Sequence, residues 1–225
     1  MKLSIIIPCF NEEKCIGLVL RKLDEFSKSG AEILIIDDGS TDNTAGVASK
    51  NGGKVITHST NRGKGISIRE GIAFAKHEVI LFLDGDGQDD PADIPKLYRA
   101  IEQGADFVIG SRWLGELRHG AISKLNFLVT GMLSTLISVL FKTNITDSQA
   151  GFRCVRKSKV KDFRLRAEGY DIETEMLIKA IKHKLRIVEV PVTRSKRLQG
   201  STKMKRLQLG IKILSHMLRE LLIHN

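Results

Sequence analysis

The stretch Val79-Ile80-Leu81-Phe82-Leu83-Asp84-Gly85-Asp86-Gly87-Gln88-Asp89-Asp90-Pro91 decides the fold. Its five apolar residues predict a buried strand, and the polar turn and proline predict a loop and the start of a helix. Ligands of open α/β sheets bind at the edge where the strands end. Asp84, Asp86 and Gln88 offer the hard oxygen atoms that Mg²⁺ or Mn²⁺ prefers. The alternative is that they are solvated loop residues, because a D-x-D pattern alone is a weak signal.

The surrounding sequence repeats a strand–helix pattern. Apolar strands are predicted at Leu3–Ile7, Ala31–Ile36 and Lys54–Thr57, and each is followed by a polar turn and a helical pattern. After the acidic stretch, a helix over residues 91–103 and a strand over residues 106–110 form a further unit. This alternation predicts an α/β fold with a mostly parallel central sheet and helices on both faces.

Polar residues follow the first two strands as well. Asn11 is placed to cap the helix after the first strand. Asp37 and Asp38 lie directly at the end of the second strand, on the edge that also carries the central acidic pair. Capping by Ser40 or Thr41 accounts for part of this turn. Two acidic strand ends on one rim favour a nucleotide site, in which one carboxylate binds the nucleoside and the others a metal on the diphosphate.

The common nucleotide-binding fingerprints are absent from the sequence. No G-x-G-x-x-G follows the first strand, and no G-x-x-x-x-G-K-[ST] occurs, so neither a dinucleotide fingerprint nor a P-loop is predicted. The basic, glycine-rich segment 61–65 is equally compatible with a phosphate contact and with a plain loop.

Positive charge is concentrated in the C-terminal half. The net charge is +10, and the segment from Gly151 to Arg206 carries 17 Lys and Arg against 6 Asp and Glu, which accounts for the whole excess. Such a region can bind nucleic acid, an anionic membrane surface or a phosphorylated substrate. Aromatic residues are only 5% of the chain and are not interleaved with the basic ones, so we expect no nucleic-acid partner.

The cysteines and the N-terminus favour a cytoplasmic protein. Cys9, Cys15 and Cys154 show no paired spacing, which predicts reduced thiols. Met1 is followed almost directly by the first predicted strand, so no secretory signal is expected. A length of 225 residues suffices for one domain with its own core.

A different pattern follows Arg112. Residues 125–141 are an uncharged run of 17 between Lys124 and Lys142, at the short limit for a membrane span. We interpret the run as an amphipathic helix that lies in the membrane interface; the alternative is a helix packed in the core. The polar face comprises Asn126, Thr130, Ser134, Thr135 and Ser138, and the apolar face Leu125, Leu128, Val129, Met132, Leu133, Leu136, Ile137, Leu140 and Phe141.

The C-terminal region combines a strand, a basic loop and a second amphipathic helix. The strand is predicted at Arg186–Val190 and is ended by Pro191. The polar, basic loop 194–206 suits a segment that closes over phosphates, although a solvated charge run has the same composition. Residues 207–223 predict a helix that packs on the core, pairs with a partner or lies on lipid.

Six motifs in this order resemble one enzyme family. They are Pro8-x-Phe10-Asn11-Glu12, Asp37-Asp38-Gly39-Ser40-x-Asp42-x-Thr44, Asp84-x-Asp86-x-Gln88-x-x-Pro91, Gly110-Ser111-Arg112, Gly151-Phe152-Arg153 and Arg197-x-x-Gly200-x-Thr202-Lys203. The chain resembles the inverting family 2 glycosyltransferases with a GT-A (Rossmann-like) fold, and among them the dolichyl-phosphate (polyprenyl-phosphate) mannosyltransferases and glucosyltransferases. The likeness covers nearly the whole chain, in a short form without the C-terminal transmembrane helices of many relatives.

The resemblance implies a role for each motif. Asp84, Asp86 and Gln88 would bind Mg²⁺ or Mn²⁺, and Gly85 would lie close to the nucleotide. Arg112 would face the sugar or, together with Arg153, the acceptor phosphate. Two positions depart from the usual pattern: Phe10 stands where Tyr is commoner, and Gly85 where Ala is frequent. The nucleoside pocket would be lined by Pro8, Phe10, Glu12, Ile36 and Asp38, and the phosphates would be clamped by Arg197 and Lys203; the implied catalytic residues are Asp86, Arg112, Arg197 and Lys203.

The implied reaction moves a hexose from a nucleotide diphosphate sugar to dolichyl or polyprenyl phosphate on the cytoplasmic face of a membrane. GDP-mannose is the favoured donor, with UDP-glucose and UDP-N-acetylglucosamine as alternatives. Residues 1–112 would bind the donor, and residues 113–225 would face the acceptor and the membrane. A lipid phosphate is already ionised near neutral pH, so it needs no strong base.

Three rival interpretations remain open at this point. A soluble glycosyltransferase with a hydroxyl acceptor would need a general base, for which Asp171 and Glu173 are candidates. A nucleic-acid-binding domain is supported by charge alone and is opposed by the acidic rim. An inactive scaffold docked on a membrane is disfavoured by the retained acidic pair and loop cations.

Overall fold

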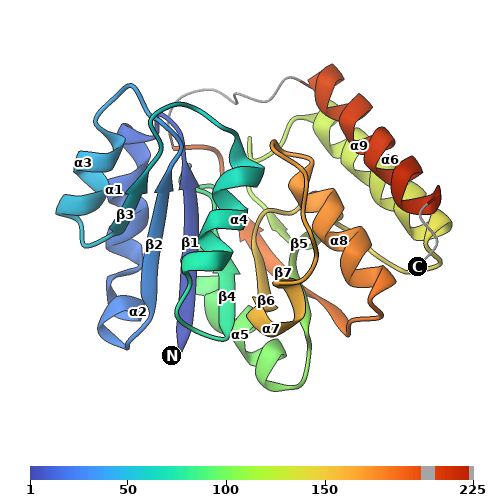
Figure 1. The fold of residues 1–225 in the computed structure, drawn as a ribbon, viewed down its shortest axis with the longest axis horizontal. Coiled ribbons are helices and arrows are strands. Elements are labelled where there is room, and N and C mark those ends of the chain that lie inside the picture. The colour runs from blue at the N-terminus through green and yellow to red at the C-terminus, as the bar shows by residue number, and fades with distance from the viewer. Residues whose placement is uncertain (199–205, 223–225) are drawn as a thin grey trace.

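The computed structural model describes residues 1–198 and 206–222, and this part of the chain folds around one seven-stranded sheet (Figure 1). The strand order is β3-β2-β1-β4-β6-β5-β7, with β6 antiparallel to both of its neighbours and the other pairs parallel. The predicted mostly parallel α/β sheet is therefore confirmed. The strands are β1 (Leu3–Cys9), β2 (Glu32–Asp37), β3 (Lys54–Thr57), β4 (Val79–Phe82), β5 (Phe107–Leu117), β6 (Arg153–Arg156) and β7 (Ile187–Arg194).

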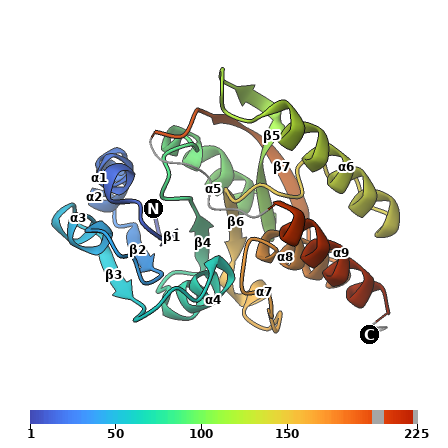
Figure 2. The same ribbon diagram turned by 90° about the horizontal axis from the view of Figure 1, so that it is seen from above.

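Helices cover both faces of the sheet, as Figure 2 shows from above. One apolar core lies beneath α1, α3 and α5, and the other beneath α4, α8, α6 and α9. β1 serves both cores, because alternate side chains of a strand point to opposite faces: Ile5 and Ile7 join the first core and Ile6 the second. The helices are α1 (Glu13–Lys22), α2 (Asp24–Lys28), α3 (Thr44–Lys50), α4 (Lys64–Phe74), the short 3₁₀ helix η1 (Pro91–Asp93), α5 (Ile94–Glu102), α6 (Lys124–Leu140), α7 (Lys157–Val160), α8 (Ile172–Lys182) and α9 (Arg206–Leu222).

The order of the strands creates a natural ligand-binding crevice. The chain passes from β1 outward to β2 and β3, then returns to place β4 on the other side of β1. The carboxyl ends of β1 and β4 are therefore the point at which the topology reverses, where open α/β sheets bind their ligands. Asp84 and Asp86 follow β4 directly at this point.

Three strands differ from the sequence-based expectation. Residues 153–156 were not predicted as a strand, but they form β6 between β4 and β5. Four residues are too few to show a clear alternation of apolar and polar side chains. β7 continues through Pro191, which an edge strand tolerates because its outer side needs no backbone donor. β5 runs on to Leu117 after an irregularity between Ser111 and Glu116.

Asn11 does not cap α1, which corrects the sequence-based expectation. Asn11 has a left-handed backbone (φ +53°), and α1 begins two residues later at Glu13. The side-chain Oδ1 of Asn11 accepts a hydrogen bond of 2.8 Å from the backbone N–H of Thr41. The residue therefore ties the turn after β1 to the turn after β2 and holds together the two segments that form one side of the rim.

Helix α6 is amphipathic, as predicted, but it is oriented with its polar face inward. Thr130 and Ser134 are buried, and Ser134 Oγ accepts a hydrogen bond from the N–H of Ser148 (3.0 Å). Most of the apolar face is exposed, including Leu128 at 60% and Met132 at 63%. The alternative of a helix packed in the core holds only in part: Ile137 is buried in the core, but most of the apolar face is not covered. Within residues 1–198 and 206–222, no helix is long and apolar enough to cross a membrane.

We predict that two Gly→Ala changes in helices will act in opposite directions. A Cβ atom on Gly71 of α4 would lie 2.4 Å from Cγ2 of Ile6 in β1. Gly71→Ala should therefore destabilise the protein by about 1–3 kcal/mol through overpacking. A Cβ atom on Gly131 of α6 meets nothing within 4 Å, so Gly131→Ala should stabilise by about 0.5–1 kcal/mol. Chemical denaturation measures both, and equal effects would contradict the packing of α4 on β1.

Candidate functional site

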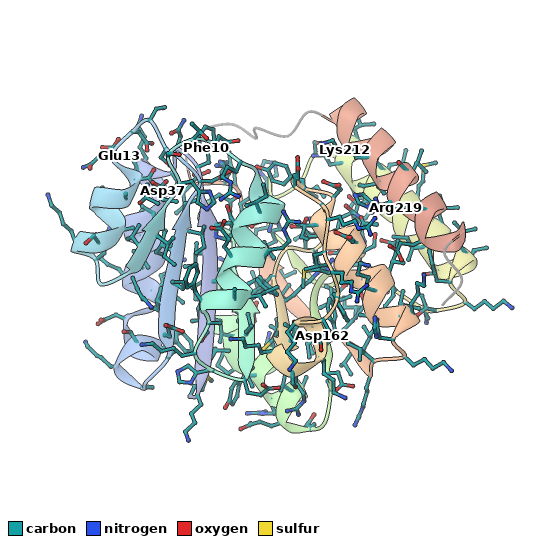
Figure 3. All side chains as sticks on the ribbon, viewed as in Figure 1. Phe10, Glu13, Asp37, Asp162, Lys212 and Arg219 are labelled. Atoms are coloured by element: carbon teal, nitrogen blue, oxygen red, sulfur yellow. The ribbon has the colours of Figure 1, made fainter. Side chains whose placement is uncertain are left out.

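A pocket of about 910 Å³ opens at the carboxyl ends of β1 and β4. Its walls come from the turns after these strands, the start of α4, the segment 120–123 and the helices α6, α8 and α9. Figure 3 shows Phe10 at this rim of the molecule and Asp162 at the opposite end. The pocket thus lies where the strand topology reverses, as the sequence pattern predicts.

Most of the residues that the motifs suggested lie in this pocket. Ile36 does not line it, which corrects one assignment: its side chain is fully buried in the core beneath the sheet. Lys203 lies outside the described residues. The suggested residues that line the pocket are Pro8, Phe10, Glu12, Asp38, Asp84, Gly85, Asp86, Gln88, Arg112 and Arg197.

Arg153 is an internal brace, which corrects its assignment to the acceptor phosphate. Its side chain is fully buried, and its guanidinium donates hydrogen bonds to the carbonyl oxygens of Ala150 (2.7 Å), Glu173 (2.6 Å) and Ser148 (2.8 Å). Burial lowers the pKa of Arg153 to about 10. These three hydrogen bonds position the loop before β6 and the start of α8. Because the guanidinium is held by them, it cannot reach a ligand in the pocket.

Lys64 neutralises Asp84 at the floor of the pocket. Its Nζ lies 2.6 Å from Asp84 Oδ1 and 2.7 Å from Glu173 Oε1. Burial alone would raise the pKa of Asp84, but the positive charges of Lys64, Arg194 and Arg112 outweigh it and hold that pKa below its usual range. The segment 61–65 therefore brings an ammonium group into the site, although its contact with a phosphate stays a prediction.

Asp86 experiences the opposite effect. Burial and the negative charge of Asp84 raise the pKa of Asp86 to about 6. Arg197 Nη1 lies 2.9 Å from Asp86 Oδ2, and the same guanidinium also pairs with Glu12. Two crowded carboxylates thus share a site with an arginine that comes from the loop predicted to close over phosphates.

Arg194 and Gln88 connect that loop to the turn after β4. Arg194 donates to Asp89 Oδ1 (2.6 Å) and to Gln88 Oε1 (2.9 Å). Gln88 Nε2 in turn donates to the carbonyl oxygens of Ala121 and Ser195, each at 3.1 Å. The side-chain oxygen that would make Gln88 a metal ligand is therefore engaged by Arg194 in this structure.

Arg112 is held in the pocket wall by a buried carboxylate. Its Nε and Nη2 donate to the two oxygens of Asp147, each at 2.6 Å, in a bidentate pair. Burial alone would raise the pKa of Asp147, but the hydrogen bonds and the positive charge of Arg112 lower it. The pair fixes the orientation of Arg112 from the side away from the pocket.

The two acids considered as general bases have different surroundings. Glu173 lines the pocket beside Lys64. Asp171 is not part of the lining; its Oδ2 lies 2.7 Å from Nε2 of His216 and so links α8 to α9. Of these two acids, Glu173 is the one that lines the pocket.

Asp38 organises the loop in front of α4. Its carboxylate accepts hydrogen bonds from the N–H groups of Arg62 (2.9 Å) and Gly63 (2.8 Å). His58 bridges Asp38 and Glu70, with each ring nitrogen 2.7 Å from a carboxylate oxygen. Burial alone would lower the pKa of His58, but the hydrogen bonds to Asp38 and Glu70 and their negative charges outweigh it and raise that pKa. The His58 ring thus links the end of β3, the loop and α4.

The model of the glycosyl transferase family 2 matches residues 4–164, which carry most of this site. The chain belongs to that family. It is 32% identical over 212 residues to a dolichol-phosphate mannosyltransferase of Pyrococcus furiosus, covering 91% of this chain and 60% of that protein. It is 33% identical over 221 residues to a dolichyl-phosphate beta-glucosyltransferase of Saccharomyces cerevisiae, covering 85% and 66%. The chain thus spans about two thirds or less of the length of these two relatives.

A solved structure supports the fold of this glycosyltransferase. Glucosyl-3-phosphoglycerate synthase of Mycobacterium tuberculosis, in complex with Mn²⁺, UDP and glucosyl-3-phosphoglycerate, superposes with a TM-score of 0.80 over 100% of this chain and 81% of that one. The identity is 21%, so the likeness bears on the fold alone. The predicted GT-A architecture is confirmed.

Asp84 and Asp86 fit a divalent cation. Mg²⁺ commonly uses one or two carboxylates and completes its shell with phosphate oxygens and water. Burial and, after it, the negative charge of Asp84 raise the pKa of Asp86, and a divalent cation would relieve the repulsion between the two carboxylates. In the described ranges 1–198 and 206–222, no group of three or more His, Cys, Asp or Glu side chains could hold a metal by itself. A metal held by Asp84 and Asp86 would rely on oxygen atoms from the bound diphosphate.

Sequence reasoning missed several polar residues of the glycosyltransferase site. Arg194 and Lys64 lie in segments noted for their basic character, but nothing in the sequence pairs them with Asp89 and Asp84. Asp147 lies 35 positions from Arg112, and His58 lies 20 from Asp38. Such pairs come from the folding of distant segments onto one rim, and a single sequence shows no local signal for them.

We predict that His58 stabilises this glycosyltransferase in a pH-dependent way. Because its pKa is raised in the folded state, its contribution is complete below about pH 6.5, the unfolded value, and is lost as pH rises through the folded value. His58→Gln should cost about 1–3 kcal/mol near pH 6. The free energy of unfolding of the wild type should fall more steeply above pH 6.5 than that of the variant. The exposed His119→Gln serves as the control, and parallel pH profiles for His58→Gln and wild type would refute the bridge.

Proposed function

We propose that the protein transfers a hexose, with mannose favoured, from a nucleotide diphosphate sugar to dolichyl or polyprenyl phosphate. GDP-mannose is the favoured donor, and UDP-glucose and UDP-N-acetylglucosamine are the alternatives. The similarity to the two dolichyl-phosphate glycosyltransferases supports this substrate class. The reaction would use Mg²⁺ or Mn²⁺ and take place on the cytoplasmic face of a membrane.

The observation that carries the proposal is the two-sided character of the pocket. At one end it contains Asp84 and Asp86 with the cations that surround them. Where α6 and α9 form the wall, the lining includes the apolar side chains of Leu125, Val129, Leu133 and Ile213 beside the polar side chains of Asn126 and Thr130. A polyprenyl phosphate has the same division into a charged head and an apolar tail. A small sugar or a protein hydroxyl would not need the apolar end.

The cations of the pocket suit the departure of a nucleoside diphosphate. Negative charge builds on the β-phosphate as the glycosidic bond breaks, and a metal held by Asp84 and Asp86 would neutralise part of it. The Arg197 guanidinium, now on Asp86 and Glu12, would exchange these partners for phosphate oxygens. Preorganised charges in a water-poor site stabilise such a developing anion strongly.

The acceptor end of the pocket needs a cation more than it needs a base. The acceptor phosphate is ionised near neutral pH and can attack the anomeric carbon directly. Arg112, fixed by Asp147, would orient it from the pocket wall. Attack on the face opposite the leaving diphosphate inverts the configuration at the anomeric carbon.

The test is a transfer assay with purified protein, Mg²⁺ or Mn²⁺, a short polyprenyl phosphate in detergent, and radiolabelled GDP- and UDP-sugars. We expect label from GDP-mannose to enter the lipid phase and EDTA to abolish the transfer. Asp86→Ala should lower the rate at least about 100-fold, because it removes a carboxylate that would hold the metal opposite the developing negative charge. Asp162→Ala removes an exposed acid at the opposite end of the molecule and should leave the rate unchanged (Figure 3).

The other outcomes of this assay separate the two halves of the proposal. Hydrolysis or metal-dependent binding of a donor without labelling of the lipid would reject the polyprenyl phosphate acceptor. Absence of binding by every donor would reject the nucleotide-sugar site. Transfer from UDP-glucose instead of GDP-mannose would keep the reaction and change the donor.

We further propose that α6 docks the enzyme on the membrane that holds the acceptor. α6 and α9 lie at the same end of the molecule in both views, and both contribute to the wall of the pocket (Figures 1 and 2). The exposed apolar face of α6 adjoins this wall, and exposed lysines, Lys124 and Lys142, flank the helix at its two ends. Apolar insertion with flanking cations is the pattern of interfacial helices.

Two charges on the exposed face of α6 should abolish this docking. Leu128→Glu with Met132→Glu places both on one face and leaves the buried polar side of α6 intact. We expect partition onto vesicles of phosphatidylcholine and phosphatidylglycerol to fall about 10- to 100-fold. Leu18→Glu, at a 41% exposed leucine of α1, is the matched control. Equal sedimentation of both variants with vesicles would exclude α6 as the docking helix.

A further inference from the structure

Asn61 presents an oriented side-chain amide in the wall of the pocket. The residue is exposed and lies in the loop between β3 and α4. Its Nδ2 donates to the carbonyl oxygen (3.2 Å) and to the carboxylate Oδ2 (2.9 Å) of Asp38. Both partners are acceptors, so the nitrogen of the amide, and not its oxygen, has to face them. Within residues 1–198 and 206–222, the amide oxygen Oδ1 of Asn61 accepts no hydrogen bond.

Asp38, in contrast, is engaged on every side by the loop. Its Oδ1 lies 2.7 Å from Nδ1 of His58 and accepts a hydrogen bond from the N–H of Arg62 (2.9 Å). Its Oδ2 accepts hydrogen bonds from Nδ2 of Asn61 (2.9 Å) and from the N–H of Gly63 (2.8 Å). A carboxylate offers about four acceptor positions, and these four groups fill them. The acceptor beside Asp38 that a ligand can use is therefore the amide oxygen of Asn61.

The location of Asn61 indicates which part of a nucleotide it would meet. The backbone of its partner Asp38 pairs with the turn after β1, so Asn61 lies where the turns after β1 and β2 meet. The N–H of Gly63 binds Asp38, and the next residue, Lys64, reaches Asp84 with its ammonium group. Little more than one lysine side chain thus separates Asn61 from the acidic turn. With the diphosphate at that turn and the polyprenyl chain along α6, the turns after β1 and β2 are left for the base.

We propose that Asn61 selects the base of the donor by accepting, at Oδ1, a hydrogen bond from the ring N–H of guanine or uracil. This inference rests on the proposed function, because it assumes a nucleotide sugar in the pocket. Guanine carries this N–H at N1 and uracil at N3, whereas adenine and cytosine have an acceptor nitrogen at these positions. Adenine or cytosine would therefore place two acceptors against each other. Asp38 is a positioning residue, because it orients the amide of Asn61 and does not touch the base.

The test compares bases of equal size. Dissociation constants are measured, with Mg²⁺ present, for GDP against ADP and for UDP against CDP, and for 1-methyl-GDP and 3-methyl-UDP, which lack the ring N–H. For wild type, we expect the nucleotide of the true donor to bind about 10- to 100-fold more tightly than its partner of equal size and than its methylated form. Asn61→Ala should weaken that nucleotide by a similar factor, change binding of ADP and CDP less than about threefold, and so remove the discrimination.

Asn51→Ala is the matched control and should leave every dissociation constant unchanged. The amide of Asn51 also donates to a backbone carbonyl, that of Val47 (2.8 Å), but Asn51 is not part of the pocket lining. Thermal unfolding checks that each variant folds, and Asn61→Ser, which keeps a small polar side chain in the loop, replaces Asn61→Ala if the latter does not.

A purely structural role of Asn61 gives a different result. If the Asn61 variant weakens all nucleotides by the same factor, the residue only braces the loop through Asp38 and the inference fails. It also fails if wild type binds the methylated nucleotides as tightly as the unmethylated ones. Absence of binding of every nucleotide by wild type would reject the proposed function itself.

Discussion

Buried negative charge at the carboxyl ends of β1 and β4 is the constraint on which this site depends. Asp84, Asp86 and Asp89 lie within six positions of each other, and Asp86 and Asp89 are almost wholly buried. Charges in such surroundings are tolerated only when they are paired. The partners Lys64, Arg194 and Arg197 come from the start of α4, the end of β7 and the loop after it. Charge pairing therefore brings three distant segments to one rim and builds the pocket.

The inverted orientation of α6 follows from the loop that leads into β6. Ser148 in that loop binds Ser134 on the polar face of α6, while Asp147 beside it holds Arg112 in the pocket wall. Hydrogen bonding to the buried loop thus attaches the polar face of α6 to the fold. The apolar face is left outside, next to the open end of the pocket. One short loop sets both the acceptor-side arginine and the orientation of the helix.

The sequence predicted the parts of this molecule that rest on local patterns. The strand–helix alternation and the acidic turn at Asp84 were sufficient for the sheet and the rim, and the resemblance to the family 2 glycosyltransferases supplied most of the predicted pocket residues. It did not predict β6, since four residues carry too little periodicity, or the continuation of β7 through Pro191, which depends on a position at the sheet edge. The sequence also did not predict which of the charged residues are buried. Arg153 and Arg112 look alike in the sequence. The structure shows that the Arg153 guanidinium donates hydrogen bonds to three backbone carbonyl oxygens.

The arrangement of cations also links the loop after β7 to nucleotide binding. The Arg197 guanidinium forms ion pairs with Asp86 and Glu12. On the proposed function, a metal would compete with this guanidinium for the carboxylate of Asp86. The repulsion that raises the pKa of Asp86 favours whichever cation binds there more strongly. A divalent ion carries twice the charge of the guanidinium, and the phosphates offer Arg197 new acceptors. Exchange of partners at Asp86 would therefore release Arg197 toward the diphosphate. Lys64 would be affected as well, because its partner Asp84, at 2.6 Å, is the other carboxylate that would hold the metal. On the proposed function, binding of a metal and a diphosphate would thus change the partners of two cations that now neutralise the acidic turn, Lys64 from α4 and Arg197 from the loop after β7.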